Sequence, residues 1–278
     1  MRPVSISTGG QWTSFTASSF NLLFLCQCSG QQSAVPLAVV EEILLNLPAH
    51  QVVQVCRLVC HEWKELVDSA AHWRERCRTE GFQPYNASSP PEDWRLFYFL
   101  SKFRRNLLKN PRADDGLQGW EIGQSGADRW ATERNSKLFP DNTVTKCFVT
   151  SQSQCFKEQL IDLKKEGYSD AFMDQQRPHI KISDWYAPCF DCGSEYQICV
   201  ELLDQKKTPI KTFQPEKVIF SFRNSQPWCE TSHVFKNYGP GVRFVRFTHG
   251  GNDTQYWAGH YGIRVTNSSV VIYPADER

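Results

Sequence analysis

The chain has 278 residues, of which 40% are hydrophobic and 13% aromatic, and its formal net charge is +1 at pH 7. Such a composition suffices for one or two packed domains. The near-neutral charge argues against nucleic-acid binding and against attachment to an anionic membrane, both of which need a broad basic surface. Its eleven cysteines are scattered through helix-like and strand-like stretches, which favours a reducing compartment over a disulfide framework.

The first 32 residues carry one short apolar stretch, residues 20–26, behind Arg2 and many Ser and Thr. This arrangement superficially suggests a signal peptide, but the stretch is too short to span a bilayer. We expect a disordered extension. A working signal, and with it a lumenal or secreted protein, is the alternative.

Residues 35–77 predict a helical domain. Apolar residues recur at helical spacing over residues 39–47 and again over 52–67. Pro36 suits a first helical turn, and Pro48 ends one helix or starts the next. The apolar positions exceed what one helix can hide in so short a domain, which leaves two interpretations: a self-contained three-helix bundle, or a segment that meets a partner.

The order of Leu47-Pro48, residues 57–60 (Arg-Leu-Val-Cys) and Trp63 resembles an F-box, although Val35 and Ala38 stand where Leu and an acidic residue are commoner. The resemblance gives an F-box at residues 33–80 that docks on the Skp adaptor of a cullin–RING ubiquitin ligase and performs no catalysis. The residues that it implies for adaptor binding are Pro36, Val39, Val40, Ile43, Leu44, Leu47, Pro48, Leu58, Val59 and Trp63.

Residues 81–105 predict a linker that contains a helix. Residues 82–92 are rich in Pro, Ser and Asn, which is typical of a loop. An amphipathic helix then opens at Asp93, a suitable capping residue. We expect this helix to couple the two domains rather than to act as a free tether.

From residue 106 the periodicity becomes alternating, and short β-branched and aromatic runs are separated by Gly, Pro, Asn and Asp. The predicted strands are residues 118–122, 146–150, 179–185, 196–203, 242–248 and 269–273. Residues 158–166 are either a helix or irregular. We therefore expect an α+β multidomain chain: a small all-α domain followed by an antiparallel β-sandwich. The sequence has no repeat of fixed period, which argues against a propeller or solenoid.

Several strings in this second part, above all residues 249–262 (HGGNDTQYWAGHYG) and 264–269 (RVTNSS), resemble the F-box-associated domain of the sugar-recognising F-box proteins. The resemblance implies a jelly-roll or galactose-binding-like sandwich of about ten strands over residues 106–276. It also implies end loops that, in the best-known members, bind the chitobiose core of high-mannose N-glycans on misfolded glycoproteins, which are then ubiquitinated for endoplasmic-reticulum-associated degradation.

The resemblance carries over five candidate glycan-binding residues. Tyr256 and Trp257 match aromatics whose faces suit the C–H face of a pyranose, and Asp191 matches an acidic residue that accepts hydrogen bonds from the sugar. Ala258 stands where the strongest binder has a lysine, and Gln152 where it has an aromatic. Loss of one aromatic wall weakens binding by about 1 to 3 kcal/mol, or about tenfold to a hundredfold.

We therefore expect a non-catalytic, cofactor-free substrate receptor in the cytoplasm, with the cytosolic face of the endoplasmic reticulum as a candidate location. One alternative is the same adaptor recognising protein surface instead of sugar. Another is a secreted lectin-like module, in which the sequons at Asn86, Asn252 and Asn267 would be acceptors.

Cys189 and Cys192 form a single C-x-x-C, which is too few ligands for structural zinc. The histidines at positions 233, 249 and 260 are interpreted as structural.

Overall fold

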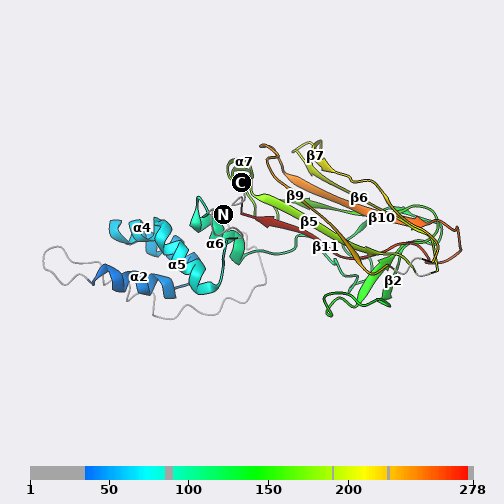
Figure 1. The fold of residues 1–278 in the computed structure, drawn as a ribbon. Helices are drawn as coiled ribbons and strands as arrows, with labels where there is room; N and C mark the ends of the chain where they lie inside the picture. The colour runs from blue at the N-terminus through cyan, green and yellow to red at the C-terminus, as the bar shows by residue number, and fades with distance from the viewer. Residues whose placement is uncertain (1–34, 85–89, 190, 224–225, 275–278) are drawn as a thin grey trace, which may run out of the picture. The chain divides into compact units, whose positions relative to one another are not determined.

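The computed structural model describes residues 35–84, 90–189, 191–223 and 226–274. The expected amino-terminal extension, its apolar stretch and the sequon at Asn86 lie outside these residues. The chain divides into two compact units, and the main boundary falls within one helix, between Tyr98 and Phe99 (Figure 1).

The first unit is built from short helices that begin at the two proline signals. Helix α2 (Leu37–Asn46) follows Pro36 and α3 (Ala49–Gln54) follows Pro48. Each proline thus stands where its missing N–H leaves no intrahelical hydrogen bond unmade. The other elements are the 3-10 turn η2 (Cys56–Leu58), α4 (His61–Asp68), α5 (Ala70–Glu80) and the first part of α6 (Trp94–Lys102).

The helical spacing over residues 52–67 does not form one continuous helix, because α3 ends at Gln54 and α4 begins at His61. Val55 and Cys60 have non-helical backbone angles, in a stretch whose β-branched valines are weak helix formers. The apolar side chains still meet in one core, which contains Val40, Leu44, Val52, Cys56, Trp63, Val67, Trp73 and Cys77.

Arg76 ties α5 to the end of α2. Its buried guanidinium donates hydrogen bonds to the carbonyl oxygens of Leu44, at 2.6 Å, and Leu47, at 2.8 Å. The last carbonyls of a helix have no intrahelical partner. Arg76 therefore fixes the position of α2 within the bundle.

The second unit is an antiparallel β-sandwich of two sheets. Sheet A has the order β1-β4-β10-β6-β7, with β8 also paired to β6, and sheet B has the order β2-β3-β11-β5-β9. The bounds are β1 (Glu121–Ser125), β2 (Ala131–Arg134), β3 (Lys146–Val149), β4 (Cys155–Asp162), β5 (His179–Ala187), β6 (Ser194–Leu203), β7 (Pro209–Phe213), β8 (Val218–Phe220), β9 (Cys229–Phe235), β10 (Phe244–Asp253) and β11 (Arg264–Tyr273), with α7 (Asp170–Gln175) between β4 and β5.

The six predicted strands correspond to β1, β3, β5, β6, β10 and β11, with shifted bounds. The prediction of a helix or irregular chain at residues 158–166 was wrong, because this segment is the second half of β4 and the turn after it. The inward-facing side chains of β4 are Cys155, Lys157, Gln159 and Ile161. Two of these four are polar, so the alternation that marks a strand is hidden in the sequence.

A polar network lies inside the sandwich. The carboxylate of Asp184 is fully buried and accepts hydrogen bonds from Tyr196 Oη at 2.7 Å, Ser268 Oγ at 2.7 Å and His249 Nδ1 at 2.6 Å. These donors come from β6, β11 and β10, so a single carboxylate on β5 connects the two sheets. A buried carboxylate needs such partners to offset its lost hydration.

Lys157 on β4 is also fully buried, and its Nζ has no hydrogen-bond partner among the described residues. The Nζ lies 3.1 Å from the ring centroid of Trp120 and 3.6 Å from that of Phe148. Aromatic faces attract an ammonium, but they do not replace the hydrogen bonds that water provides. The sandwich therefore contains an unusual amine within an aromatic cage.

The central strand β10 passes very close to both of its neighbours near its end. A Cβ atom at Gly250 would overlap the carbonyl oxygen of Cys155 on β4, and one at Gly251 would overlap that of Glu195 on β6. Only glycine fits at such close backbone approaches. The two glycines thus fix where β10 ends and where the loop that follows it leaves the sheet.

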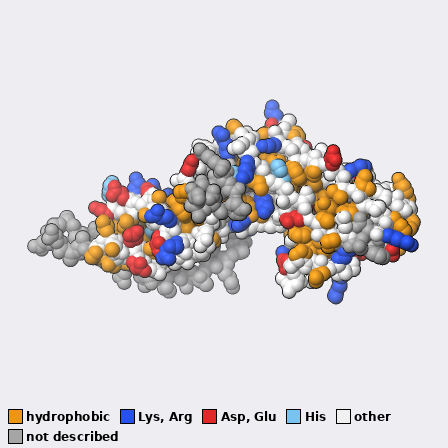
Figure 2. Space-filling model, viewed as in Figure 1, with side chains coloured by type: hydrophobic (Ala, Val, Ile, Leu, Met, Phe, Trp, Pro, Cys, Tyr) orange, Lys and Arg blue, Asp and Glu red, His pale blue; other side chains and the backbone are white. Residues whose placement is uncertain are grey.

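Charges are mixed on the face of the protein that Figure 2 draws. On the face drawn in Figure 2, basic and acidic side chains are interspersed with hydrophobic ones, in agreement with the net charge of +1. A neutral, mixed surface gives little long-range steering of charged ligands. Recognition therefore depends on local features.

Candidate functional site

The loop between β10 and β11, residues 254–263, presents a set of exposed aromatic rings at one end of the sandwich. Tyr256 is 75% exposed, and Trp257 and Tyr261 are each 42% exposed. Exposed rings gathered on one loop are a common sign of a binding surface. The predicted residues Tyr256, Trp257 and Ala258 lie together here.

Asp253, the last residue of β10, holds this loop. Its carboxylate is fully buried and accepts the backbone N–H of Gln255 on Oδ1 and that of Trp257 on Oδ2, each at 2.8 Å. Its own N–H donates to the carbonyl of Ser151 at 3.1 Å. Hydrogen bonds to a carboxylate are stronger than those between neutral groups, so the backbone beneath Trp257 is fixed.

A second carboxylate supports the far side of the loop. Asp128 Oδ2 accepts the N–H of Gly259 at 2.7 Å, and the carbonyl oxygen of Asp128 lies 3.1 Å from His260 Nε2. Between the two anchors, Tyr256 has a φ of +57°, in the left-handed region that side chains such as tyrosine seldom adopt. The loop is therefore held in a definite shape by its backbone contacts.

The other two predicted residues lie in segments that touch this loop. Gln152 is half-buried and forms an isolated parallel bridge with Asp253. Asp191 is exposed, and two residues later the carbonyl of Gly193 accepts the N–H of Thr254 at 2.9 Å. All five predicted residues therefore belong to three segments that meet at one end of the sandwich.

Phe222 belongs to the same surface but was not predicted. It follows β8, is 43% exposed, and its ring centroid lies 6.0 Å from that of Trp257. The anchors Asp253 and Asp128, and the neighbouring ring Tyr261, were also missed. A sequence-level signal existed only for Asp253, whose position before a run of turn residues is typical of side chains that cap backbone amides.

The residues predicted to bind an adaptor fall into two groups in the helical unit. Val40, Leu44 and Trp63 are buried in its core, whereas Val39 is 47% exposed and Leu58 is 74% exposed. Pro36 and Pro48 are exposed, and the side chains of Ile43, Leu47 and Val59 are partly buried. Exposed Leu37 on α2 and Val55 between α3 and η2, at 56% and 58%, add further apolar surface to the helical unit. The buried residues support the helices, and the exposed ones are free to contact a partner.

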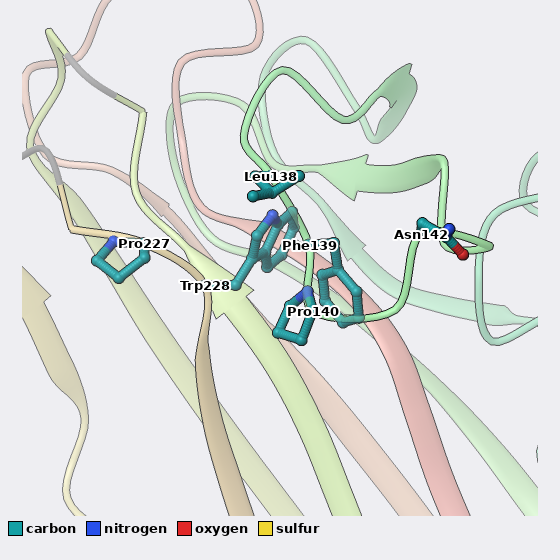
Figure 3. Close-up of a pocket in the computed structure, with 6 residues that line it drawn as sticks. All are labelled: Leu138, Phe139, Pro140, Asn142, Pro227 and Trp228. Atoms are coloured by element: carbon teal, nitrogen blue, oxygen red, sulfur yellow. The ribbon is translucent and has the colours of Figure 1, made fainter.

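A shallow pocket of about 330 Å³ lies elsewhere on the sandwich, where the loop between β2 and β3 covers the outer side of sheet B. Figure 3 shows Leu138, Phe139 and Pro140 on that loop beside Trp228, which precedes β9. Phe139 packs edge-to-face against Trp185 and Trp228, with ring centroids 4.9 and 5.4 Å apart. None of the five predicted glycan-binding residues lines this pocket.

Two groups that could perform other chemistry have pKa values shifted by burial. Burial raises the pKa of the Cys192 thiol, with the neighbouring Cys189 as a smaller cause, and a thiol with a raised pKa is a poor nucleophile. Burial also lowers the pKa of His249. Across residues 35–84, 90–189, 191–223 and 226–274, no cluster of three or more His, Cys, Asp and Glu side chains could hold a metal ion, and no helix could cross a membrane.

Two family sequence models match the chain. The F-box domain model matches residues 33–75, and the model of the F-box associated region matches residues 98–272. F-box only protein 44 of Mus musculus is 45% identical over 249 residues, which cover 88% of this chain and 98% of the relative. F-box only protein 6 of Bos taurus is 44% identical over 242 residues, covering 86% and 91%, and F-box only protein 2 of Bos taurus is 42% identical over 247 residues, covering 86% and 83%.

Proposed function

We propose, because the chain belongs to the family of F-box proteins that carry an F-box-associated region, that its sandwich captures N-glycosylated proteins for ubiquitination. Proteins of this family serve as substrate-recognition subunits of SCF (Skp–cullin–F-box) ubiquitin ligases. The client is then a misfolded glycoprotein whose high-mannose N-glycan exposes its chitobiose core, and the process is endoplasmic-reticulum-associated degradation. The proposal locates the protein in the cytoplasm, including the cytosolic face of the endoplasmic reticulum.

The observation that carries the sugar proposal is the exposed pair Tyr256 and Trp257 on a loop fixed by Asp253. The apolar C–H face of a pyranose stacks on an aromatic ring, while its hydroxyl groups need polar partners nearby. Asp191, exposed on the adjoining turn, offers a carboxylate that can accept hydrogen bonds from such hydroxyls. Preformed, rigid aromatic surfaces also lose little conformational entropy on binding.

Binding to chitobiose and to a high-mannose glycopeptide tests this proposal. We expect Trp257→Ala to abolish glycoprotein capture by the full chain, because it removes the largest ring of the surface. Leu138→Ala is the matched control, since Leu138 is 93% exposed but lines the separate pocket. If the folded wild-type protein captures no glycan, the adaptor recognises protein surface instead, which is the alternative that Gln152 keeps open.

The adaptor part of the proposal depends on the exposed apolar residues of the helical unit. Leu58→Glu places a charge on a side chain that is 74% exposed, so it should prevent co-purification with the Skp adaptor and leave the fold intact. Leu160→Glu is the control, because Leu160 is an exposed leucine of the sandwich at 37%. Failure of wild-type protein to bind the Skp adaptor would instead support a lectin-like module without ligase function.

A further inference from the structure

We propose that Phe222 and Tyr261 are ligand-contacting residues that form two aromatic walls beside Trp257, and that Phe222 offsets the missing aromatic at Gln152. This inference rests on the proposed sugar-binding function and deepens it. We call Phe222, Trp257 and Tyr261 the three-ring platform, and we call the loop of residues 254–263 the platform loop. The members of the three-ring platform come from two loops that are 35 residues apart in the sequence.

The geometry of the three-ring platform suits one C–H face of a pyranose ring. The rings of Phe222 and Tyr261 stand at 83° and 86° to the indole of Trp257, with centroids 6.0 and 5.8 Å away. Two rings perpendicular to a third can confine a pyranose laterally while its C–H face lies on the indole. Phe222 and Tyr261 do not bury each other, because the side chain of each remains more than 40% exposed.

The exposure of these rings calls for an explanation. Phe222, Trp257 and Tyr261 are 43%, 42% and 42% exposed, and the adjoining Tyr256 is 75% exposed. Burying the free part of an aromatic side chain removes an unfavourable contact with water. An aromatic patch formed by two loops, one of which has a fixed backbone, is therefore prepared for an apolar ligand face.

The strand order places Phe222 and Gln152 on opposite flanks of the platform. In sheet A, β10 lies between β4 and β6. Gln152 precedes β4, whereas Phe222 follows β8, whose Phe220 pairs with Ser194 at the start of β6. A wall on the β6 flank can thus replace part of the apolar contact that glutamine cannot supply on the β4 flank.

The β6 flank also carries the polar partner of the platform. A Cβ atom at Gly193 would come within 3.3 Å of the carbonyl oxygen of Phe220, and the carbonyl of Gly193 binds the N–H of Thr254. The turn that bears Asp191 therefore lies against both β8 and the platform loop. A sugar bound between Trp257 and Phe222 would therefore lie beside the turn that carries the Asp191 carboxylate.

Tyr261 is held in place by the loop itself. The ring lies against Gly259, where a Cβ atom would come within 3.1 Å of Tyr261 Cε2. Gly259 has a φ of +110° and donates its N–H to Asp128. The backbone that supports this wall is thus tied to the second carboxylate anchor, and its ring is preorganised.

Titration calorimetry with chitobiose, using the full chain, tests the two walls. We expect Phe222→Ala and Tyr261→Ala each to weaken binding about tenfold, a typical loss for one aromatic contact. Phe222→Tyr should bind within about threefold of wild type, since it keeps the ring. Ile219→Ala is the matched control, because Ile219 lies on β8 and is 62% exposed, and it should bind like wild type.

The outcomes separate this inference from the proposed function. If wild type binds chitobiose, Trp257→Ala does not, and Phe222→Ala and Tyr261→Ala bind like wild type, the walls are absent and only this inference is overturned. If wild type does not bind chitobiose, both proposals are overturned. Equal losses for Phe222→Tyr and Phe222→Ala, with unchanged thermal unfolding, would also overturn the role of the Phe222 ring as a wall.

Discussion

Replacement of Lys157 with methionine should stabilise the sandwich at neutral pH. The Lys157 side chain is fully buried, and its Nζ lies 3.1 Å from the ring centroid of Trp120 without a hydrogen-bond partner among the described residues. Burial lowers the pKa of Lys157 well below its usual value, against a smaller opposing effect of the Asp184 carboxylate. Burial in the folded protein therefore disfavours the charged ammonium and favours release of its proton.

The magnitude follows from the proton that Lys157 releases on folding. A lysine in the unfolded chain has a pKa of about 10.4, so a neutral amine in the folded state costs at most about 5 kcal/mol at pH 7 and about 2 kcal/mol at pH 9. Because the proton is released on folding, the free energy of unfolding of wild type rises with pH above the pKa that Lys157 has in the folded protein, by up to about 1.4 kcal/mol per pH unit.

Methionine has a similar length and keeps contact with Trp120 and Phe148 through favourable sulfur–aromatic interactions. Because burial disfavours the ammonium in the folded protein, methionine forgoes little of the attraction between an ammonium and these rings, which is about 2 kcal/mol at a dehydrated site. We therefore expect Lys157→Met to be more stable than wild type by about 1 to 4 kcal/mol at pH 7. The difference should shrink as pH rises from 7 to 9.

Urea unfolding at pH 7, 8 and 9 measures this difference, and hydrogen exchange of peptides from β4 and β10 assigns it to the sandwich. Lys165→Met is the control, because the Lys165 side chain is 83% exposed and should leave stability unchanged. The reasoning would be refuted by a Lys157→Met protein that is less stable than wild type by an amount independent of pH. That result would mean that the ammonium is charged and that the aromatic cage and Asp184 stabilise it.

Three further outcomes are expected. Burial lowers the pKa of His72 to about 4, so the free energy of unfolding of the helical unit should fall by about 2 kcal/mol as the pH falls from 7 to 5. His72→Met should remove this loss in thermal unfolding, and an unchanged pH dependence in the variant would contradict the prediction. Gln152→Phe should raise chitobiose affinity about tenfold in calorimetry, because Gln152 bridges to Asp253 through its backbone; an affinity equal to wild type would refute the aromatic-wall argument. Asp253→Asn replaces one carboxylate oxygen with an N–H donor, so one loop amide loses its acceptor. Glycan affinity should therefore fall about tenfold, and the protein should lose about 1 to 3 kcal/mol of stability. Binding as tight as wild type would show that Asp253 does not position Trp257.

The sequence predicted the strands in which apolar residues alternate over most of the strand length. Residues 179–185 and 196–203 alternate clearly, and they form most of β5 and β6. It failed at β4, because Lys157 and Gln159 occupy inward positions where periodicity arguments expect apolar residues. The cage of Trp120 and Phe148 around Lys157 is a tertiary feature, and no local pattern announces it.

Part of the candidate site was predicted from one string of residues, and Asp191 and Gln152 came from the family resemblance. Tyr256 and Trp257 stand between glycines, which marks a loop, and the structure has them on an exposed loop. Phe222 gave no such signal, because a single aromatic near a strand is ordinary in sequence. Its relation to Trp257 depends on the pairing of β8 with β6, a non-local contact that a pattern of neighbours in sequence cannot reveal.

The backbone hydrogen bonds that hold the platform loop allow its ligand specificity to change through substitution of side chains. Asp253 and Asp128 hold the loop through the backbone amides of Gln255, Trp257 and Gly259. Because a backbone amide is present whatever the side chain, residues 255–258 can change after gene duplication with little effect on loop shape. The anchors and the paired glycines of β10 must stay, while the ligand-facing residues can diverge, as in an antibody loop on its framework. A family with this construction can acquire new ligands by a few substitutions at one place.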